Sequence, residues 1–314
     1  MFYYRAVKRK LFLISFLLVL FPGIAEANPE IVVVQSIRVK PYEEAIKGFR
    51  SVCDVRMKRV VLSELGRADA MRNIKDIGPE MVLAIGGDAL SMAKTIKSIP
   101  VVYVMVLNPQ SRLSGEENIR GVSMNIPPKQ QLRALLRALP HIKTVGLLYN
   151  PDRTGYFVRE AQETALEIGI SLVARQIYSP KDSPALIMDM KGKIDAFWML
   201  PDITLITPQT VEFLLLFSLE NKIPLLAFSE KYVELGAFMS TGIDAFDMGR
   251  QAGGIANKIL SGTDVKNVQH VGARRLVVST NLMVARKLGI NVALAKSLGT
   301  SSSQKIIKEA LMVN

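Results

Sequence analysis

Residues 144–155, which read TVGLLYNPDRTG, constrain the fold of this chain more than any other stretch. The near-continuous apolar run from Val145 to Tyr149 is typical of a strand that is buried on both faces of a parallel sheet. Pro151 ends that strand, and we expect Thr154 to cap the amphipathic helix that follows. Open α/β sheets use this unit to present backbone N–H groups and short polar side chains at one edge of the sheet.

The same unit recurs along the chain. Buried strands that end in short polar residues are predicted at residues 31–36, 81–85, 101–107, 145–149, 196–200 and 225–228. Amphipathic helices between these strands predict an α/β fold with doubly wound parallel sheets and right-handed crossovers. The interval of 114 positions that separates Ser36 from Asn150 also separates Asp88 from Asp202. We interpret this recurrence as two similar lobes, although ordinary βα units of similar length are the alternative explanation.

The chain of 314 residues is long enough for two such domains. We predict that residues 28–122 plus 245–268 form lobe 1, that residues 126–242 plus 273–292 form lobe 2, and that residues 293–314 form a C-terminal tail with a flexible break at 301–303.

The first 27 residues predict a secretory signal peptide. Basic residues at positions 5 and 8–10 precede a short apolar core at 11–21, and Ala25 and Ala27 supply small residues at both cleavage-defining positions. An uncleaved membrane anchor is the alternative, but the apolar run is shorter than the roughly 20 residues that a spanning helix needs. We therefore expect cleavage after Ala27 and a periplasmic protein. No cysteine lies just after the cleavage point, so a lipid anchor is unsupported.

The chain is basic, with a formal net charge of +12. Its lysines and arginines are scattered, which favours a solvated surface over a nucleic-acid interface, and we expect no nucleic-acid partner. The single cysteine, Cys53, lies on the apolar stripe of the first predicted helix and is expected to be a buried, inert thiol. No cluster of cysteine or histidine offers metal-ligand spacing, so the sequence predicts no metal, no cofactor and no catalytic residue.

Several segments, in order, resemble the ABC-transporter substrate-binding family, whose characterised members include tryptophan and aromatic amino acid binders. These segments are GVSMNIPPKQQL, VGLLYNPD, LPDITLITPQT, ENKIPLLAFSEKYVELGA and the Gly-Arg-Gln-Ala run at residues 249–252, and the likeness covers residues 31–290. The resemblance implies a type I periplasmic binding protein fold. Its two α/β lobes would be joined by three crossings, near residues 121–127, 240–247 and 266–274, with a small organic solute bound between them. Asp88 departs from the small hydroxyl or apolar residue that we expect in the family pattern.

Residues at the carboxyl ends of the predicted strands form the candidate ligand site. The candidates are Ser36, Gly86, Gly87, Asp88, Asn108, Asn150, Thr154, Asp202, Thr204, Ser229 and Asp244. For a zwitterionic solute, the serine and threonine hydroxyls suit the carboxylate, and Asp202 or Asp244 suits the ammonium. Each hydroxyl, and Asp244, can instead be a plain helix cap, and Asp202 can instead stabilise its turn.

Aromatic residues give little indication of the solute. Tyr42 follows the first strand and can stack on a solute, but it shares the apolar stripe of its helix, so we expect it in the core. Arg38 is expected to be solvated. Trp198 lies in the middle of a strand and is interpreted as buried packing rather than a ligand platform. An aromatic solute is therefore compatible with the sequence but not indicated by it.

The resulting prediction is a monomeric periplasmic component of an ABC import system, without enzyme activity. It would trap a small organic solute, an amino acid or a related molecule, by hinge closure and deliver it to a permease in the inner membrane. A nucleotide-binding enzyme is one alternative, because Gly86-Gly87-Asp88 resembles the phosphate loops of lipid and NAD kinases. The chain lacks GxxxxGK[ST] and has no GxGxxG after its first strand. A soluble sensor that feeds a membrane receptor is the other alternative, since it would share the fold and the cleft.

Overall fold

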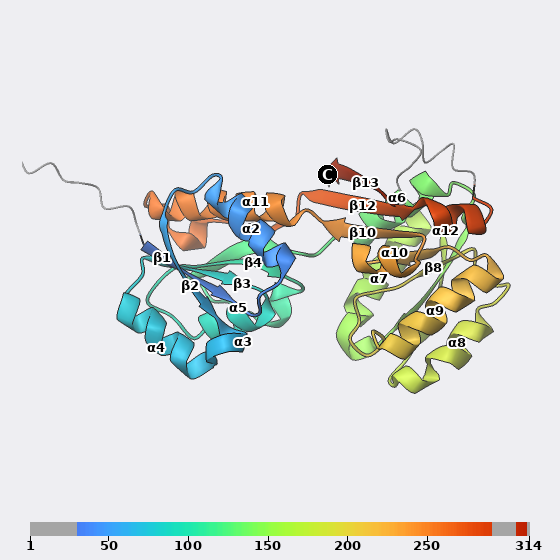
Figure 1. Cartoon of the computed structure of the whole chain (residues 1–314), viewed down its shortest axis with the longest axis horizontal. Coiled ribbons are helices and arrows are strands. Elements are labelled where there is room, and N and C mark those ends of the chain that lie inside the picture. The colour runs from blue at the N-terminus through green and yellow to red at the C-terminus, as the bar shows by residue number, and fades with distance from the viewer. Residues whose placement is uncertain (1–29, 291–305, 313–314) are drawn as a thin grey trace, which may run out of the picture.

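The computed structural model describes residues 30–290 and 306–312. The predicted signal peptide and the predicted break at 301–303 therefore lie outside the described residues. The described chain forms two α/β lobes that lie side by side along the long axis of the molecule, each built around its own sheet (Figure 1). None of the helices in these two ranges is long and apolar enough to cross a membrane.

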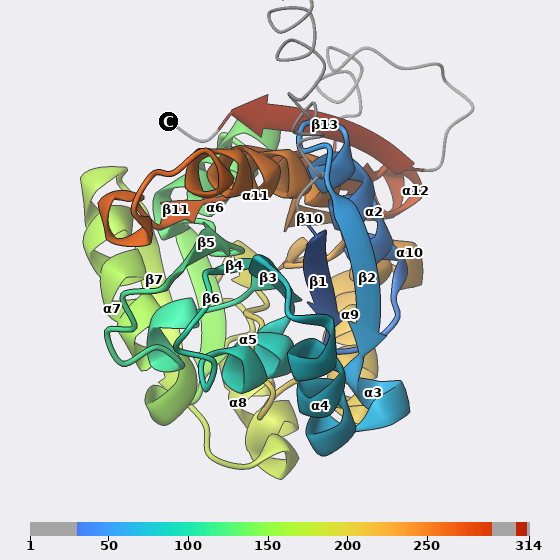
Figure 2. The same ribbon diagram turned by 90° about the vertical axis from the view of Figure 1, so that its left-hand side faces the viewer.

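The first lobe contains a six-stranded sheet in which every pair of neighbours is parallel. Its strands are β1 (Glu30–Gln35), β2 (Arg56–Val61), β3 (Met81–Ile85), β4 (Val101–Val106), β5 (Ile119–Ser123) and β11 (Val271–Gly272), in the spatial order β11-β5-β4-β3-β1-β2. Its helices are α2 (Lys40–Arg50), α3 (Leu62–Leu65), α4 (Arg67–Ile77), α5 (Gly87–Ala93) and α11 (Ala245–Leu260), with short 3-10 turns at η1 (Pro109–Ser111) and η3 (Val265–Asn267). Helices α2 and α11 cover one face of the sheet, and α4 and α5 cover the other (Figure 2).

The second lobe contains a seven-stranded sheet. Its strands are β6 (Thr144–Tyr149), β7 (Ser171–Gln176), β8 (Ala196–Trp198), β9 (Leu225–Ala227), β10 (Met239–Ile243), β12 (Arg275–Asn281) and β13 (Ile306–Met312), in the spatial order β13-β12-β10-β9-β8-β6-β7. Its helices are α6 (Pro128–Ala138), α7 (Pro151–Glu167), α8 (Ser183–Asp189), α9 (Pro208–Asn221), α10 (Glu230–Leu235) and α12 (Leu282–Lys287), with a 3-10 turn at η2 (Pro180–Asp182). Helices α6, α7 and α12 pack on one face, and α8, α9 and α10 pack on the other.

The two sheets repeat one topology. The order β5-β4-β3-β1-β2 in the first lobe corresponds to β10-β9-β8-β6-β7 in the second. Ser36 and Asn150 therefore follow the equivalent strands β1 and β6, and Asp88 and Asp202 come shortly after the equivalent strands β3 and β8. This correspondence confirms the two similar lobes that the interval of 114 positions predicted.

Three elements differ from the sequence-based expectations. The second sheet is not wholly parallel, because β12 runs antiparallel to both β10 and β13. The C-terminal tail was predicted to stand apart from the lobes, but residues Ile306–Met312 pair with β12 along its whole length. Residues 121–127 were expected to form the first crossing between the lobes, but the strand β5 extends to Ser123.

The start of α7 also corrects the prediction that Thr154 caps this helix. The N-cap is Asn150, whose side chain accepts a hydrogen bond from the backbone N–H of Asp152 at 2.9 Å. Pro151 takes the first helical position, for which its fixed φ is suited, so the cap must lie directly before it. Thr154 consequently lies in the first turn of the helix, near the carboxyl end of β6.

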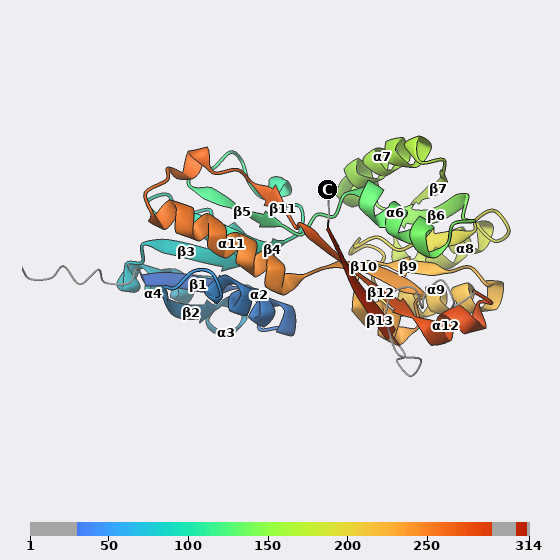
Figure 3. The same cartoon turned by 90° about the horizontal axis from the view of Figure 1, so that it is seen from above.

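The chain passes between the two sheets three times within the described residues, from β5 to α6, from β10 to α11 and from β11 to β12 (Figure 3). The third connection is held against α11. The Arg274 guanidinium donates two hydrogen bonds, of 2.6 and 2.8 Å, to the buried carboxylate of Asp247. The backbone N–H of Arg274 also donates to Gln251 Oε1 at 3.2 Å.

Candidate functional site

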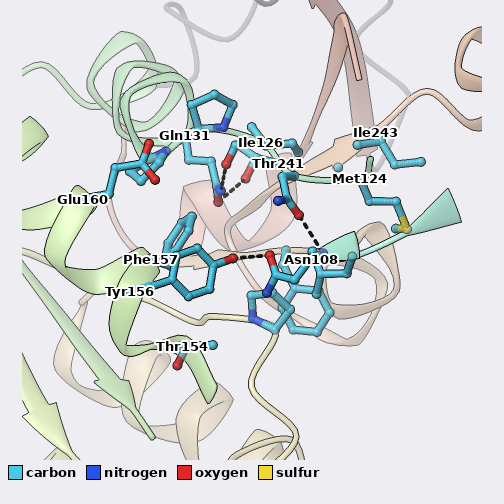
Figure 4. A pocket seen from close by; sticks show the side chains of 17 residues that line it. Asn108, Met124, Ile126, Gln131, Thr154, Tyr156, Phe157, Glu160, Thr241 and Ile243 are labelled. Carbon is cyan, nitrogen blue, oxygen red and sulfur yellow. Dashed lines mark hydrogen bonds between the residues drawn. The ribbon is translucent and has the colours of Figure 1, made fainter. Parts of the chain in front are cut away.

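A cavity of about 290 Å³ lies between the lobes, beside the first and second connections (Figure 4). The first lobe contributes Leu107 and Asn108, which follow β4, the first connection contributes residues 124–127, and Ile243 contributes from the end of β10. The second lobe contributes the other wall, made by Pro128, Gln131, Thr154, Tyr156, Phe157, Glu160, Pro201, Phe228, Thr241 and Gly242. The volume is at the lower end of the roughly 300–1,000 Å³ of small-molecule sites. Because both lobes form its walls, any molecule held there touches both.

Three aromatic side chains line the cavity: Tyr156, Phe157 and Phe228. Phe157 is anchored by an edge-on contact with Trp198, with the ring centroids 5.5 Å apart. Trp198 itself is fully buried, as predicted. The aromatic residues weighed in the sequence analysis, Tyr42 and Trp198, are therefore not the ones that line this cavity. Correct placement of the helix start at Asn150 would have put Tyr156 and Phe157 in the second turn of α7, close to the strand end.

Asn108 and Tyr156 make a hydrogen bond between the lobes. The Tyr156 hydroxyl donates to Asn108 Oδ1, and the backbone N–H of Asn108 donates to Asn125 Oδ1 at 2.9 Å (Figure 4). Burial and the nearby Glu160 carboxylate raise the pKa of Tyr156, so this hydroxyl stays protonated and able to donate. Within residues 30–290 and 306–312, the side-chain NH2 groups of Asn108 and Asn125 donate to no protein acceptor. Two amide donors are thus available at the cavity.

An irregular strand brings Asn108 to the cavity. Met105 has a φ of 58°, and the register between β4 and β5 shifts between Tyr103 and Val106. Such a bulge bends the strand and redirects the residues that follow it. Asn108 also adopts the left-handed conformation, with a φ of 48°, which asparagine tolerates better than most residues.

Gln131 organises the rear of the cavity. Its Oε1 accepts hydrogen bonds from Trp198 Nε1 and Thr241 Oγ1, both at 3.2 Å, and its Nε2 donates to the Ile126 carbonyl at 3.0 Å. These contacts tie α6 to β8, to β10 and to the first connection. We therefore interpret Gln131 as a support for the wall, and sequence reasoning missed it because its partners are distant in the chain.

Four of the sequence-predicted residues form one cluster at the end of the second sheet. Asp202 Oδ2 accepts hydrogen bonds from the Asn150 N–H at 2.9 Å and from Thr154 Oγ1 at 2.6 Å, and Asp202 Oδ1 accepts from the Thr204 N–H at 3.0 Å. The Asp202 side chain is buried, and both carboxylate oxygens have protein donors. In this structure Asp202 joins the ends of β6 and β8, and Thr154 is the member of this cluster that lines the cavity.

Apart from Asn108, the first-lobe candidates lie at the equivalent edge, outside the cavity. Ser36 Oγ accepts a hydrogen bond of 2.9 Å from the Ala89 N–H, which ties the end of β1 to the first turn of α5. Gly86 is the N-cap residue of α5 and Gly87 is its first residue, and Asp88 is exposed, with its carboxylate 3.9 Å from the Arg67 guanidinium.

The last two candidates begin helices. Asp244 caps α11 by accepting from the Asp247 N–H at 2.9 Å, as predicted, and its carboxylate lies 3.8 Å from Arg275. Ser229 is the N-cap residue of α10, but its side chain makes no capping hydrogen bond. Neither residue lines the cavity, although Phe228, next to Ser229, does. Within the described part of the chain, no group of three or more His, Cys, Asp or Glu side chains could hold a metal ion.

These features define a binding protein of the type I periplasmic class: two α/β lobes of one topology with a cavity between them. Residues 60–302 match the family of ABC transporter substrate binding proteins, and the chain belongs to that family.

Individual relatives are more distant. A tyrosine-binding protein from Clostridioides difficile is 24% identical over 198 residues, which cover 60% of this chain and 57% of that protein, so the match spans little more than half of the relative. A ligand-free, open substrate-binding protein with adhesive properties from Clostridium difficile superimposes with a TM-score of 0.74 at 20% identity, over 88% of this chain and 97% of that one. An ABC domain from Streptococcus pneumoniae in complex with L-Trp superimposes with a TM-score of 0.62 at 21% identity, over 86% and 98%. At these identities the two structures establish the fold.

Proposed function

We propose that this protein is the periplasmic solute-binding component of an ABC import system, which traps an amino acid or a related small molecule and delivers it to a permease. The observation that carries the proposal is the cavity between the lobes, with Asn108 on one wall and Tyr156 on the other. A solute bound to both walls favours the form in which the lobes are close together, and a permease can recognise that form.

The chemistry of the cavity supports an amino acid with an apolar or aromatic side chain. The Asn108 and Asn125 amides offer donors to a carboxylate, and Phe157 and Phe228 offer apolar surface to a side chain. The names of two similar proteins agree, since one is a tyrosine-binding protein and another was solved with L-Trp.

We propose that closure about the three connections brings the two sheet edges together. The first-lobe edge carries Ser36, Gly86, Gly87 and Asp88, and the second-lobe edge carries Asn150, Thr154, Asp202, Thr204 and Ser229. In this proposal Asn108 and Thr154 touch the solute, whereas Asp202 and Asp244 hold the segments around it.

The proposal includes export and a monomeric state. A signal peptide cleaved after Ala27 would place the mature chain in the periplasm, where substrate-binding proteins of ABC importers meet their permeases.

The family is one of substrate-binding proteins rather than enzymes, and we propose that this chain performs no turnover. The turn from Gly86 to Asp88, which suggested a nucleotide site, lies outside the cavity. A salt bridge to Arg67 engages Asp88 there.

A thermal-shift panel of amino acids, other small metabolites and nucleotides tests the proposal on the mature protein. A solute at 100 times its dissociation constant adds about 2.7 kcal/mol to the free energy of unfolding, which raises the melting temperature measurably. We expect one or a few amino acids to do so and nucleotides to have no effect. A shift with nucleotides alone, or an unchanged radius of gyration by X-ray scattering at saturation with the best solute, would contradict the proposal.

A further inference from the structure

The geometry points to Glu160 as the residue that selects solutes carrying an ammonium group; this inference rests on the proposed function. Glu160 lies four residues after Tyr156 and three after Phe157 in α7, so the three side chains share one face of the helix. All three line the cavity, as Figure 4 shows.

The charge on the described residues that line the cavity is negative. Glu160 is the single carboxylate among the described residues that line it, and no lysine, arginine or histidine is among them. Within residues 30–290 and 306–312, the Glu160 carboxylate has no hydrogen bond or ion pair. Lys129, on the facing helix α6, pairs instead with Glu167 at 2.6 Å. The field of Glu160 reaches into the cavity, since it helps to raise the pKa of Tyr156 there. An uncompensated negative charge beside an apolar cavity favours a solute with a positive group.

Asp202 and Asp244, the two acids that the sequence suggested for an ammonium group, already interact with other groups of the protein. Asp202 accepts three hydrogen bonds from its own lobe, and Asp244 caps α11 and faces Arg275. Neither lines the cavity, whereas Glu160 does. A zwitterionic solute can therefore direct its ammonium toward Glu160 on the second lobe and its carboxylate toward the amide of Asn108 on the first. This orientation would make the solute a link between the lobes.

The test is a cycle of two ligands and two proteins, measured by calorimetry. The probes are L-tyrosine and its des-amino analogue 3-(4-hydroxyphenyl)propionate, and the proteins are the wild type and Glu160→Gln. We expect Glu160→Gln to weaken tyrosine binding about 10- to 100-fold, the range of one hydrogen bond to a charged group, and to leave the affinity for the analogue unchanged or higher. Glu163→Gln is the matched control, because Glu163 is exposed on the same helix but does not line the cavity.

The outcomes separate the two proposals. Equal loss of affinity for both probes, or tyrosine binding by Glu160→Gln as tight as by the wild type, would overturn the role of Glu160 and leave the proposed function intact. If the wild type binds another amino acid in the thermal-shift panel, the same cycle is run with that amino acid and its des-amino analogue. If the wild type binds no amino acid at all, both the proposed function and this inference fail. The melting temperature of ligand-free Glu160→Gln should equal that of the control variant.

Discussion

The hydroxyl of Tyr156 in α7 donates a hydrogen bond to Oδ1 of Asn108, which follows β4, so the two lobes are in direct side-chain contact at the cavity. The contact lies at the mouth of the proposed solute site and not in the backbone connections. Tyr156 is half-exposed, so its hydroxyl can exchange this partner for water when the lobes separate.

Removing the Tyr156 hydroxyl should weaken the contact between the two lobes. One hydrogen bond contributes a net stabilisation of about 0.5–1.5 kcal/mol, so we expect Tyr156→Phe to weaken solute affinity about 2- to 10-fold. We also expect the ligand-free variant to have a larger radius of gyration than the wild type. Calorimetry and X-ray scattering measure the two effects. Tyr178→Phe is the control, because the exposed Tyr178 hydroxyl donates to Gln176 Oε1 in its own lobe, at 3.4 Å, and not across to the other lobe. Scattering curves of Tyr156→Phe and the wild type that superimpose would show that the bond does not hold the lobes.

Replacing Asp202 by alanine should destabilise the second lobe. The substitution removes the acceptor of the buried Asn150 N–H and of the Thr204 N–H, and it leaves the Thr154 hydroxyl with only the Asn150 carbonyl, at 3.4 Å, among its acceptors in the described residues. We expect the free energy of unfolding in urea to fall by about 2–4 kcal/mol. Asp189→Ala, which removes an exposed carboxylate paired with Lys193 and Arg175, should cost less than about 1 kcal/mol. A fully stable Asp202→Ala protein that no longer binds solute would instead support the ligand contact expected from the sequence.

Two glycines in α11 should respond in opposite directions to alanine. A Cβ at Gly249 would overlap the Ala45 carbonyl oxygen in α2, because the two helices touch backbone to backbone there. We expect Gly249→Ala to lower the free energy of unfolding by about 1–3 kcal/mol. A Cβ at Gly254 meets no atom within 4 Å, so Gly254→Ala should raise it by up to about 1 kcal/mol. Equal effects of the two substitutions in denaturant titrations would contradict the close packing of α2 on α11.

The thiol of Cys53 should be unreactive in the folded protein. Cys53 is buried, as predicted, and burial raises its pKa to about 11. At pH 8 the thiol is therefore almost wholly protonated, whereas an unfolded cysteine with a pKa near 8.5 is about one quarter ionised. A thiol-specific chromogenic reagent should react at least about 100-fold more slowly with the native protein than with the urea-unfolded protein. Comparable rates would show that the first lobe opens readily around α2.

The strands that were predicted correctly are those that their own apolar residues identify, without reference to distant parts of the chain. The apolar runs of β1, β3 and β4 are buried in the first sheet and that of β6 is buried in the second, and their sequences alone mark both their type and their ends. Helix caps also depend on local partners, and the cap role considered for Asp244 is the one that this residue takes at the start of α11.

The elements that were missed depend on distant partners. The strand β5 contains Gly121, and this glycine is needed because a Cβ there would overlap Tyr103 in β4, a contact that the β5 sequence does not reveal. The strand β13 forms because β12, far away in the chain, offers it an open edge, and Ile307 is buried as a result.

The sequence by itself determined the two-lobed α/β architecture, since alternation of buried strands and amphipathic helices depends only on which residues are apolar and at what spacing. It also placed polar residues at the strand ends. Only the tertiary structure decided which of them face the cavity, because neighbouring strand ends compete for the same donors and acceptors. The Asp202 carboxylate accepts hydrogen bonds from Asn150 and Thr154, whereas the carboxylate of Glu160, within α7, lines the cavity and pairs with no group in the described part of the chain.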